Sequence, residues 1–180
     1  MGVPKAGVEL AGRPLVAYAV DTVAAAGLDP VVVAKRGSQL PPLDCPVVTD
    51  AEAASHPAAG ILAALNAGHG RPAVVIACDM PFVPAPLVGF LAGLEAPAAV
   101  PRIGGRLQPL LARYEPSATT VLEAAIGRGD PMHEAVAGLD PLVLETEDVA
   151  RFGDPERIAF NVNDRHDLAA AERLMTVASR

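Results

Sequence analysis

The sequence has few aromatic side chains and an excess of acidic over basic residues. Only 3% of its 180 residues are aromatic and none is tryptophan, whereas 51% are hydrophobic, many of them Ala and Val. Such small side chains favour close packing of helices on a sheet over an aromatic-rich barrel or sandwich. The net charge is -7, which argues against a general nucleic-acid-binding protein, because such a protein needs a basic face.

Cysteines and long apolar runs are also scarce. The two cysteines, Cys45 and Cys78, do not have the spacing of metal ligands, and we expect two buried, reduced thiols rather than a disulfide. No apolar run reaches the roughly 20 residues of a membrane span, and the first residues lack the apolar core of a signal peptide. We therefore expect a cytoplasmic protein that binds neither membranes nor nucleic acid, as a monomer or a small homo-oligomer.

Helix-like and strand-like segments alternate along the chain. Apolar residues at helical spacing predict helices, and short β-branched runs predict buried strands. The expected helices are 14–27, 58–70, 85–94, 117–129, 131–139 and 165–178. The expected strands are 30–35, 46–50, 73–81 and 141–146, with a further pair within 97–114. We expect Ser117 to cap its helix and 147–158 to be a polar loop.

This alternation predicts one α/β domain over residues 1–180. Apolar strands separated by helices are typical of a mostly parallel sheet that is covered on both faces. The glycine pair Gly104 and Gly105 predicts a turn between two strands, and therefore a β-hairpin insertion that makes the sheet mixed.

Polar side chains follow three of the predicted strands. Asp50 and Asp79 each end a strand, and Asn161 and Asn163 precede the last helix together with Asp164. Ligands of parallel α/β sheets bind at the carboxyl ends of the strands. We therefore expect these side chains to converge on one site.

Each polar residue has both a functional and an ordinary structural interpretation. Asp79 offers the hard oxygen ligand that Mg²⁺ prefers, or it is a loop or cap residue. Lys5, in "MGVPKAG", is a partner for phosphate oxygens or an exposed lysine, and Asp50 is a turn residue or a nucleotide contact. Asn161 and Asn163 face one side of an extended segment, where they bind a ligand or form Asx turns. None of the four histidines has the spacing of metal ligands, and we assign them no catalytic role.

Six segments together point to a family. "MGVPKA…GRPLV", "PVVTD", "HPAAGILAAL", "ACDMPFV", "GRLQPLLARY" and "FNVNDRHDLAAAERL" resemble the molybdenum cofactor guanylyltransferases and their MobA-like nucleotidyltransferase relatives. The resemblance extends from Met1 to about Leu174. It implies a three-layer, Rossmann-like nucleotidyltransferase fold. It also implies transfer of GMP from GTP to a molybdopterin-type molybdenum cofactor, with Mg²⁺ and with release of pyrophosphate.

The resemblance assigns roles to particular residues. It implies that Asp79 binds Mg²⁺ and the nucleotide phosphates, and that Lys5 contacts the phosphates, so that these two residues are the catalytic pair. It implies that Gly2 and Asp50 also contact the nucleotide, and that Asn161 and Asn163 lie on the pterin side of the cleft.

The sequence departs from the family pattern in three places. The family's first strand and its loop with paired glycines precede the methionine that aligns with Met1, so we expect an N-terminally incomplete domain with a vacant strand position and weak triphosphate binding. The family's motif G-P-L-A-G reads "HPAAG" here, from His56 to Gly60, so that His56 replaces the glycine before the helix. Lys35 follows the strand that usually ends in an asparagine for guanine, which leaves CTP open as the nucleotide.

Three alternatives therefore remain beside guanylyl transfer. The first is a related cytidylyltransferase, and the second is a nucleotidyltransferase that acts on a sugar phosphate or on phospholactate. The third is a non-catalytic nucleotide-binding remnant. The three charged residues Lys5, Asp50 and Asp79 argue against the remnant, because nothing in a remnant keeps charged groups directed at one cleft.

Overall fold

A computed structural model describes residues 5–49 and 56–177 of the chain. Over these ranges no helix combines the length and the apolar character that a membrane span requires. The described chain begins with a short 3-10 helix, η1 (Lys5–Gly7), followed by the two short antiparallel strands β1 (Glu9–Leu10) and β2 (Arg13–Pro14).

The main sheet has five strands and is mixed. β5 (Ala73–Ile76), β8 (Leu111–Tyr114) and β6 (Ala98–Ile103) lie side by side in that order, and β7 (Arg106–Leu107) and β9 (Leu142–Leu144) both pair with β6. β8 is antiparallel to both β5 and β6, whereas β9 is parallel to β6. β5, β6 and β9 therefore run in one direction, and the hairpin strand β8 runs against them between β5 and β6.

Two further strands form a separate sheet. β3 (Val32–Ala34) and β4 (Val47–Thr49) are parallel, with Val33 opposite Val48. Among the described strands, β3 pairs only with β4, and β5 pairs only with β8. The sheet is therefore divided into two parts between β3 and β5.

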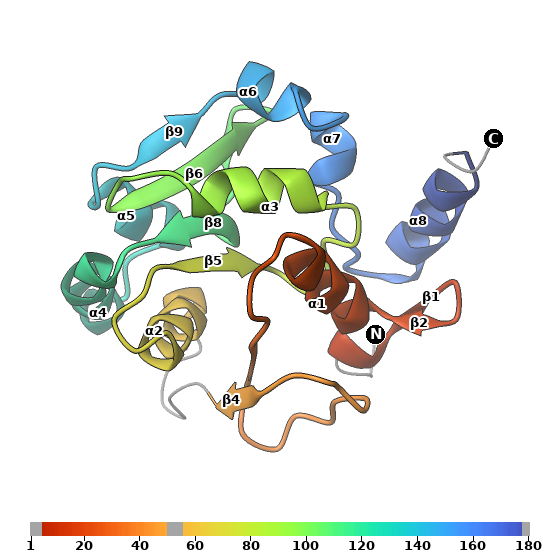
Figure 1. The fold of residues 1–180 in the computed structure, drawn as a ribbon, viewed down its shortest axis with the longest axis horizontal. Helices are drawn as coiled ribbons and strands as arrows, with labels where there is room; N and C mark the ends of the chain where they lie inside the picture. The colour runs from red at the N-terminus through yellow and green to blue at the C-terminus, as the bar shows by residue number, and fades with distance from the viewer. Residues whose placement is uncertain (1–4, 50–55, 178–180) are drawn as a thin grey trace.

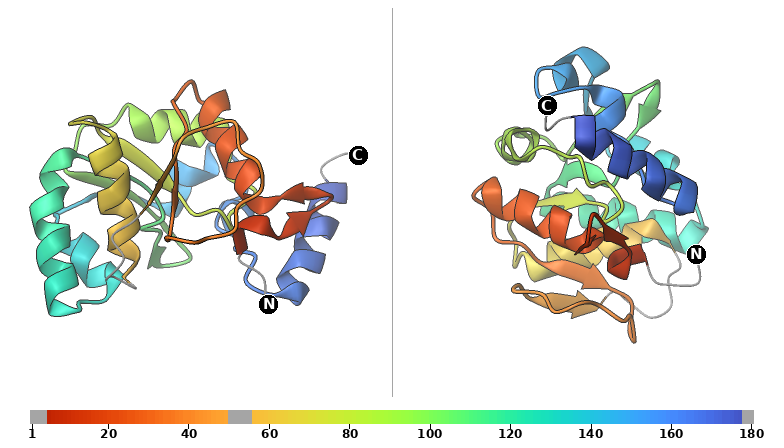
Figure 2. Two further views of the ribbon diagram at one scale, coloured as in Figure 1. Left: turned by 90° about the horizontal axis from the view of Figure 1, so that it is seen from below. Right: turned by 90° about the vertical axis from the view of Figure 1, so that its right-hand side faces the viewer.

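Helices cover both faces of the main sheet (Figures 1 and 2). Side chains of α2, α4 and α5 pack on one face, and side chains of α3, α6 and α7 pack on the other. α8 lies beside β1 and β2, at the opposite end of the molecule from α4. The helices are α1 (Leu15–Ala25), α2 (Pro57–Ala67), α3 (Ala85–Ala92), α4 (Thr119–Arg128), α5 (Met132–Ala137), α6 (Thr146–Ala150), α7 (Pro155–Ile158) and α8 (Arg165–Val177).

Apolar side chains that point alternately to the two faces of the sheet form the two hydrophobic cores. In β6, Ala98 and Val100 face the core that Tyr114 and Leu122 share, whereas Ala99 and Ile103 face the other core. Successive side chains of a strand point to opposite faces, so one apolar strand supplies both cores. This arrangement is the three-layer α/β architecture that the sequence predicts.

The glycine pair makes the predicted turn. Gly104 and Gly105 have φ values of +56° and +75°, and Ile103 pairs with Arg106 across the two-residue loop. Consecutive positive φ values are typical of a tight hairpin turn and favour glycine.

Two local predictions are wrong. Ser117 lies in the 3-10 turn η2 (Pro116–Ala118), and α4 begins after Ala118 without a side-chain cap, because Pro116 starts the turn earlier. The segment 147–158 is not a loop, since it contains most of α6 and all of α7. Both helices are very short, but each has an acidic N-cap residue, Glu145 for α6 and Asp154 for α7.

Candidate active site

Asp79 lies at the carboxyl end of β5, as the sequence predicts. β5 ends at Ile76, and the backbone N–H of Met80 donates to the carbonyl of Ala77, which turns the chain directly after the strand. Asp79 is half-buried and borders a pocket together with Cys78. A half-buried carboxylate in this place is positioned to meet a ligand at the edge of the sheet.

Residues 78–82 and 157–163, which we call the two signature segments, meet at this edge. The backbone N–H of Val162 donates to the carbonyl of Asp79 at 2.8 Å. The rings of Phe82 and Phe160 pack edge to face, with their centroids 6.0 Å apart. The guanidinium of Arg157 lies 4.9 Å from the centre of the Phe82 ring. The structure therefore brings the segment that contains Asp79 and the segment that contains the two asparagines together.

Asn161 and Asn163 flank a fully buried residue. Val162 between them has no exposed surface, whereas Asn161 is half-buried and Asn163 is exposed. The side-chain amide of Asn161 donates to the carbonyl of Ala159 at 2.8 Å, which fixes its orientation. The two asparagines thus lie on the outer side of the segment, as their spacing predicts.

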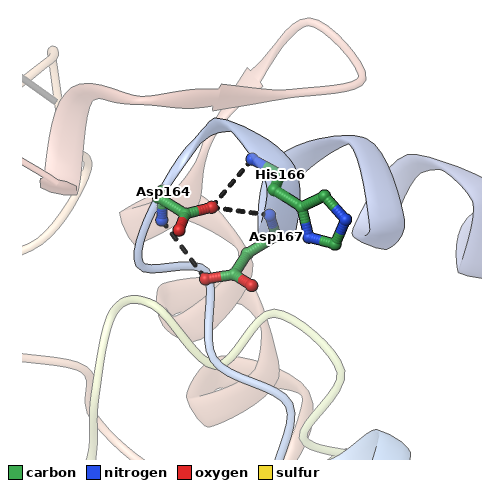
Figure 3. A group of neighbouring side chains, drawn as sticks. All are labelled: Asp164, His166 and Asp167. Atoms are coloured by element: carbon green, nitrogen blue, oxygen red, sulfur yellow. Dashed lines mark hydrogen bonds between the residues drawn. The ribbon is translucent and has the colours of Figure 1, made fainter.

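Asp164 caps the N-terminus of α8 (Figure 3). One oxygen of its carboxylate accepts hydrogen bonds from the backbone amides of His166 and Asp167, at 2.7 and 2.9 Å. The hydrogen bond from Asp167 lowers the pKa of the Asp164 carboxyl most, and the hydrogen bond from His166 lowers it further. Asp167 in turn accepts from the backbone amides of Asn163 and Asp164. The side chains of Asp164, His166 and Asp167 are close enough to ligate a cation, but the hydrogen bonds of both carboxylates serve the helix cap.

A pocket of about 830 Å³ extends from this edge between β3 and β5. Lys35, directly after β3, borders the same pocket as Asp79 and is exposed. The lining of the pocket thus includes a cationic and an anionic side chain. Its volume is in the range of small-molecule sites, which is roughly 300–1,000 Å³.

Of the three other predicted nucleotide contacts, the structure describes only Lys5. Lys5 begins η1, and the structure describes its backbone alone. Gly2 and Asp50 lie outside the described residues, so their nucleotide-binding roles stay predictions. The expected burial of the two cysteines is wrong, because Cys45 and Cys78 are both half-buried; both are free thiols.

His56 has a structural role that the sequence interpretation did not assign. Its Nδ1 accepts from the backbone amide of Ala58 at 3.1 Å and thereby caps α2. Its Nε2 lies 2.6 Å from the carbonyl of Asp130, a bond that links α2 to the loop after α4. A polar residue directly before Pro57, the first residue of a helix, is the signal that indicates such a cap.

Comparison with known proteins decides the family. A model of the MobA-like NTP transferase domain matches residues 1–140. The chain belongs to this family. A probable molybdenum cofactor guanylyltransferase of Pelotomaculum thermopropionicum is 35% identical over 141 residues, which cover 74% of this chain and 66% of that protein. The molybdenum cofactor guanylyltransferase of Pseudomonas putida is 31% identical over 162 residues, which cover 84% of each.

Solved structures of the MobA-like NTP transferases and other nucleotidyltransferases have the same fold. The molybdopterin-guanine dinucleotide biosynthesis protein A of Archaeoglobus fulgidus superposes with a TM-score of 0.81 at 27% identity, covering 98% of this chain and 92% of that one. A 2-C-methyl-D-erythritol 4-phosphate cytidylyltransferase of Thermus thermophilus gives a TM-score of 0.70 at 21% identity over 96% of this chain and 94% of its own. The family prediction and the α/β nucleotidyltransferase fold are therefore confirmed.

Proposed function

We propose that this MobA-like protein transfers GMP from GTP to a molybdopterin-type molybdenum cofactor and releases pyrophosphate. The observation that supports this proposal is the contact between the two signature segments, in which Val162 bonds to the backbone of Asp79. This bond supports a shared site, because the segment that contains Asn161 and Asn163 lies next to Asp79. The named relatives, which are molybdenum cofactor guanylyltransferases, support the choice of reaction and acceptor.

The chemistry needs little covalent help from the protein. A phosphate oxygen of the acceptor forms a bond to the α-phosphorus of GTP, and the bond from that phosphorus to the bridging oxygen breaks as pyrophosphate leaves. The protein aligns the two substrates and stabilises the charge that develops on the pyrophosphate. Because no side chain has to attack, the reaction does not require a nucleophilic Ser-His pair.

The residues at the edge fit a magnesium site that is completed by the substrate. Mg²⁺ is commonly held by one or two carboxylates and by substrate phosphates, and Asp79 supplies a half-buried carboxylate on a fixed backbone. The ion would supply charge neutralisation for the leaving group. In the proposed arrangement Lys5 contacts the phosphates, and Asn161 with Asn163 orients the acceptor.

The nucleotide is tested by thermal unfolding in the presence of Mg²⁺ and GTP, CTP or ATP. A ligand at about 100 times its Kd stabilises a protein by about 2.7 kcal/mol. Because the proposed nucleotide substrate is GTP, we expect GTP to raise Tm most when the three nucleotides are compared at equal concentration. A greater shift with CTP would support the related cytidylyltransferase instead. No shift with any of the three nucleotides would contradict nucleotide transfer and support the remnant.

The role of Asp79 is tested by Asp79→Asn, which keeps the size of the side chain and removes its charge. We expect this variant to lose the Mg²⁺-dependent part of the GTP shift. Asp140→Asn is a matched control, because Asp140 is exposed and lies before β9, outside the pocket. Equal shifts in both variants would refute the metal role of Asp79.

A further inference from the structure

Arg157, in the second signature segment, is a half-buried cation without an acidic partner in the described part of the chain. Its guanidinium lies over the ring of Phe82, and within residues 5–49 and 56–177 it forms no ion pair and no side-chain hydrogen bond. Other arginines each pair with a carboxylate: Arg13 with Asp21, Arg71 with Asp29, Arg102 with Glu145, Arg113 with Glu115 and Arg128 with Asp130. The charge of Arg157 is therefore available to a ligand.

The two acidic residues beside Arg157 on α7 serve other contacts. The carboxylate of Asp154 accepts from the backbone N–H of Glu156 at 3.1 Å and caps the helix. The carboxylate of Glu156 lies at the turn between β6 and β7, where its Oε1 is 3.3 Å from the position that a Cβ on Gly104 would occupy. Neither carboxylate neutralises the guanidinium.

Aromatic contacts hold Arg157 against both signature segments. The ring of Phe82, which the guanidinium covers, belongs to the segment that contains Asp79 and packs on the ring of Phe160. The backbone N–H of Phe160 donates to the carbonyl of Arg157 at 3.2 Å, and Asn161 follows directly. Figure 1 shows that the chain between α7 and α8 passes the end to which the arrow of β5 points. The guanidinium is thus fixed close to the proposed acceptor side of the site.

Contact with an aromatic ring does not consume the hydrogen-bond donors of a guanidinium. The ring attracts the cation electrostatically, whereas the five N–H groups lie in the plane of the guanidinium. These N–H groups form a rigid fork that matches the oxygens of a phosphate and can bind two of them at once. A ring-supported arginine with unused donors is therefore well suited to bind a phosphate group.

We propose that Arg157 binds the phosphate group of the acceptor and positions it for attack on the nucleotide. This assignment rests on the proposed function, in which an acceptor phosphate approaches the α-phosphate of GTP. Both groups are anionic, so their approach requires positive charge on the acceptor side as well as on the nucleotide side. Asn161 and Asn163 are neutral and cannot supply it, whereas Arg157 can.

The test measures binding of the molybdenum cofactor by calorimetry without any nucleotide. Arg157→Gln removes the charge and keeps a long polar side chain, and Arg157→Lys keeps the charge without the fork. We expect Kd to rise about 10- to 100-fold in Arg157→Gln, as for the loss of hydrogen bonds to a charged group, and less in Arg157→Lys. Because salt screens the pairing of charges, added salt should weaken binding more in the parent than in Arg157→Gln.

Arg151→Gln is the matched control. Arg151, directly after α6, is exposed and lies over two aromatic rings, 5.6 Å from the centre of Phe90 and 5.8 Å from that of Phe152. The control therefore loses a similar cation–ring contact outside the signature segments, and we expect its Kd for the cofactor to equal that of the parent. Equal Kd in Arg157→Gln and the parent, or equal weakening in Arg157→Gln and Arg151→Gln, would overturn the assignment.

Transfer kinetics separate this assignment from the proposed function. We expect Arg157→Gln to raise KM for the cofactor and to leave KM for GTP unchanged, which a general loss of structure would not do. Transfer with an unchanged KM for the cofactor would overturn the role of Arg157 and leave the proposed function intact. Cofactor binding that Arg157→Gln weakens, in a parent that transfers no nucleotide, would support Arg157 and contradict the proposed function. A parent that does not bind the cofactor would overturn both.

Discussion

Val162→Ala tests the packing of the C-terminal segment on residues 8–15, near the start of the chain. Val162 has no exposed surface and packs with Val8, Leu10 and Leu15 near the start of the chain and with Ala171 in α8. The substitution removes two methyl groups, worth about 1.6 kcal/mol at roughly 0.8 kcal/mol each, and it leaves a cavity. We expect the free energy of unfolding to fall by about 2–3 kcal/mol in total.

Urea unfolding followed by far-UV circular dichroism measures this loss. The matched control is Val47→Ala, because Val47 lies on β4 with 49% of its surface exposed. We expect the control to lose less than about 1 kcal/mol, the span of strand propensities. A loss in Val162→Ala no larger than that in the control would refute the packing of the C-terminal segment on the start of the chain.

Three further predictions concern stability and its pH dependence. Tyr114→Phe removes the bond of 2.8 Å to the carbonyl of Pro109 and should lower the free energy of unfolding by about 1–2 kcal/mol in a urea titration. Burial raises the pKa of Tyr114. The contribution of its neutral phenol to the free energy of unfolding is therefore complete below the ordinary tyrosine pKa of about 10 and declines as the pH rises above it. Tyr114→Phe should lack this alkaline decline in stability. The pKa of Asp164 is lowered, so the contribution of its carboxylate to stability is present above the ordinary pKa of about 4 and is lost as the pH falls below it. Asp164→Asn should therefore reduce the fall of Tm at acid pH. An unchanged dependence of Tm on pH would contradict the role of Asp164 as a charged helix cap.

The main elements and the position of Asp79 follow from local sequence patterns. Helical spacing located α1 and α2 to within a few residues, and a β-branched run located β5. The strand end that the sequence analysis expects before Asn161 is not present, because this segment follows α7 as irregular chain. Its contact with Asp79 depends instead on the backbone bond from Val162, which joins distant residues.

Other features depend on contacts between distant residues. The glycine turn predicts that β6 and β7 are neighbours, but nothing local predicts that β8 returns between β5 and β6. α6 and α7 are too short for a helical period to be detected, and the start of α4 depends on the turn at Pro116. The second bond of His56 joins it to Asp130, a residue 74 positions away.

Transfer of a labelled nucleotide tests the central claim most directly. The purified chain is incubated with Mg²⁺, molybdenum cofactor and GTP that is labelled on the α-phosphate, alongside Asp79→Asn and Asp140→Asn. We expect the label to appear on the cofactor with one pyrophosphate released per transfer, in the parent and in Asp140→Asn but not in Asp79→Asn. Equal transfer by Asp79→Asn, or label that stays on GTP in all three proteins, would contradict the proposed function of the edge of the sheet at which β5 ends.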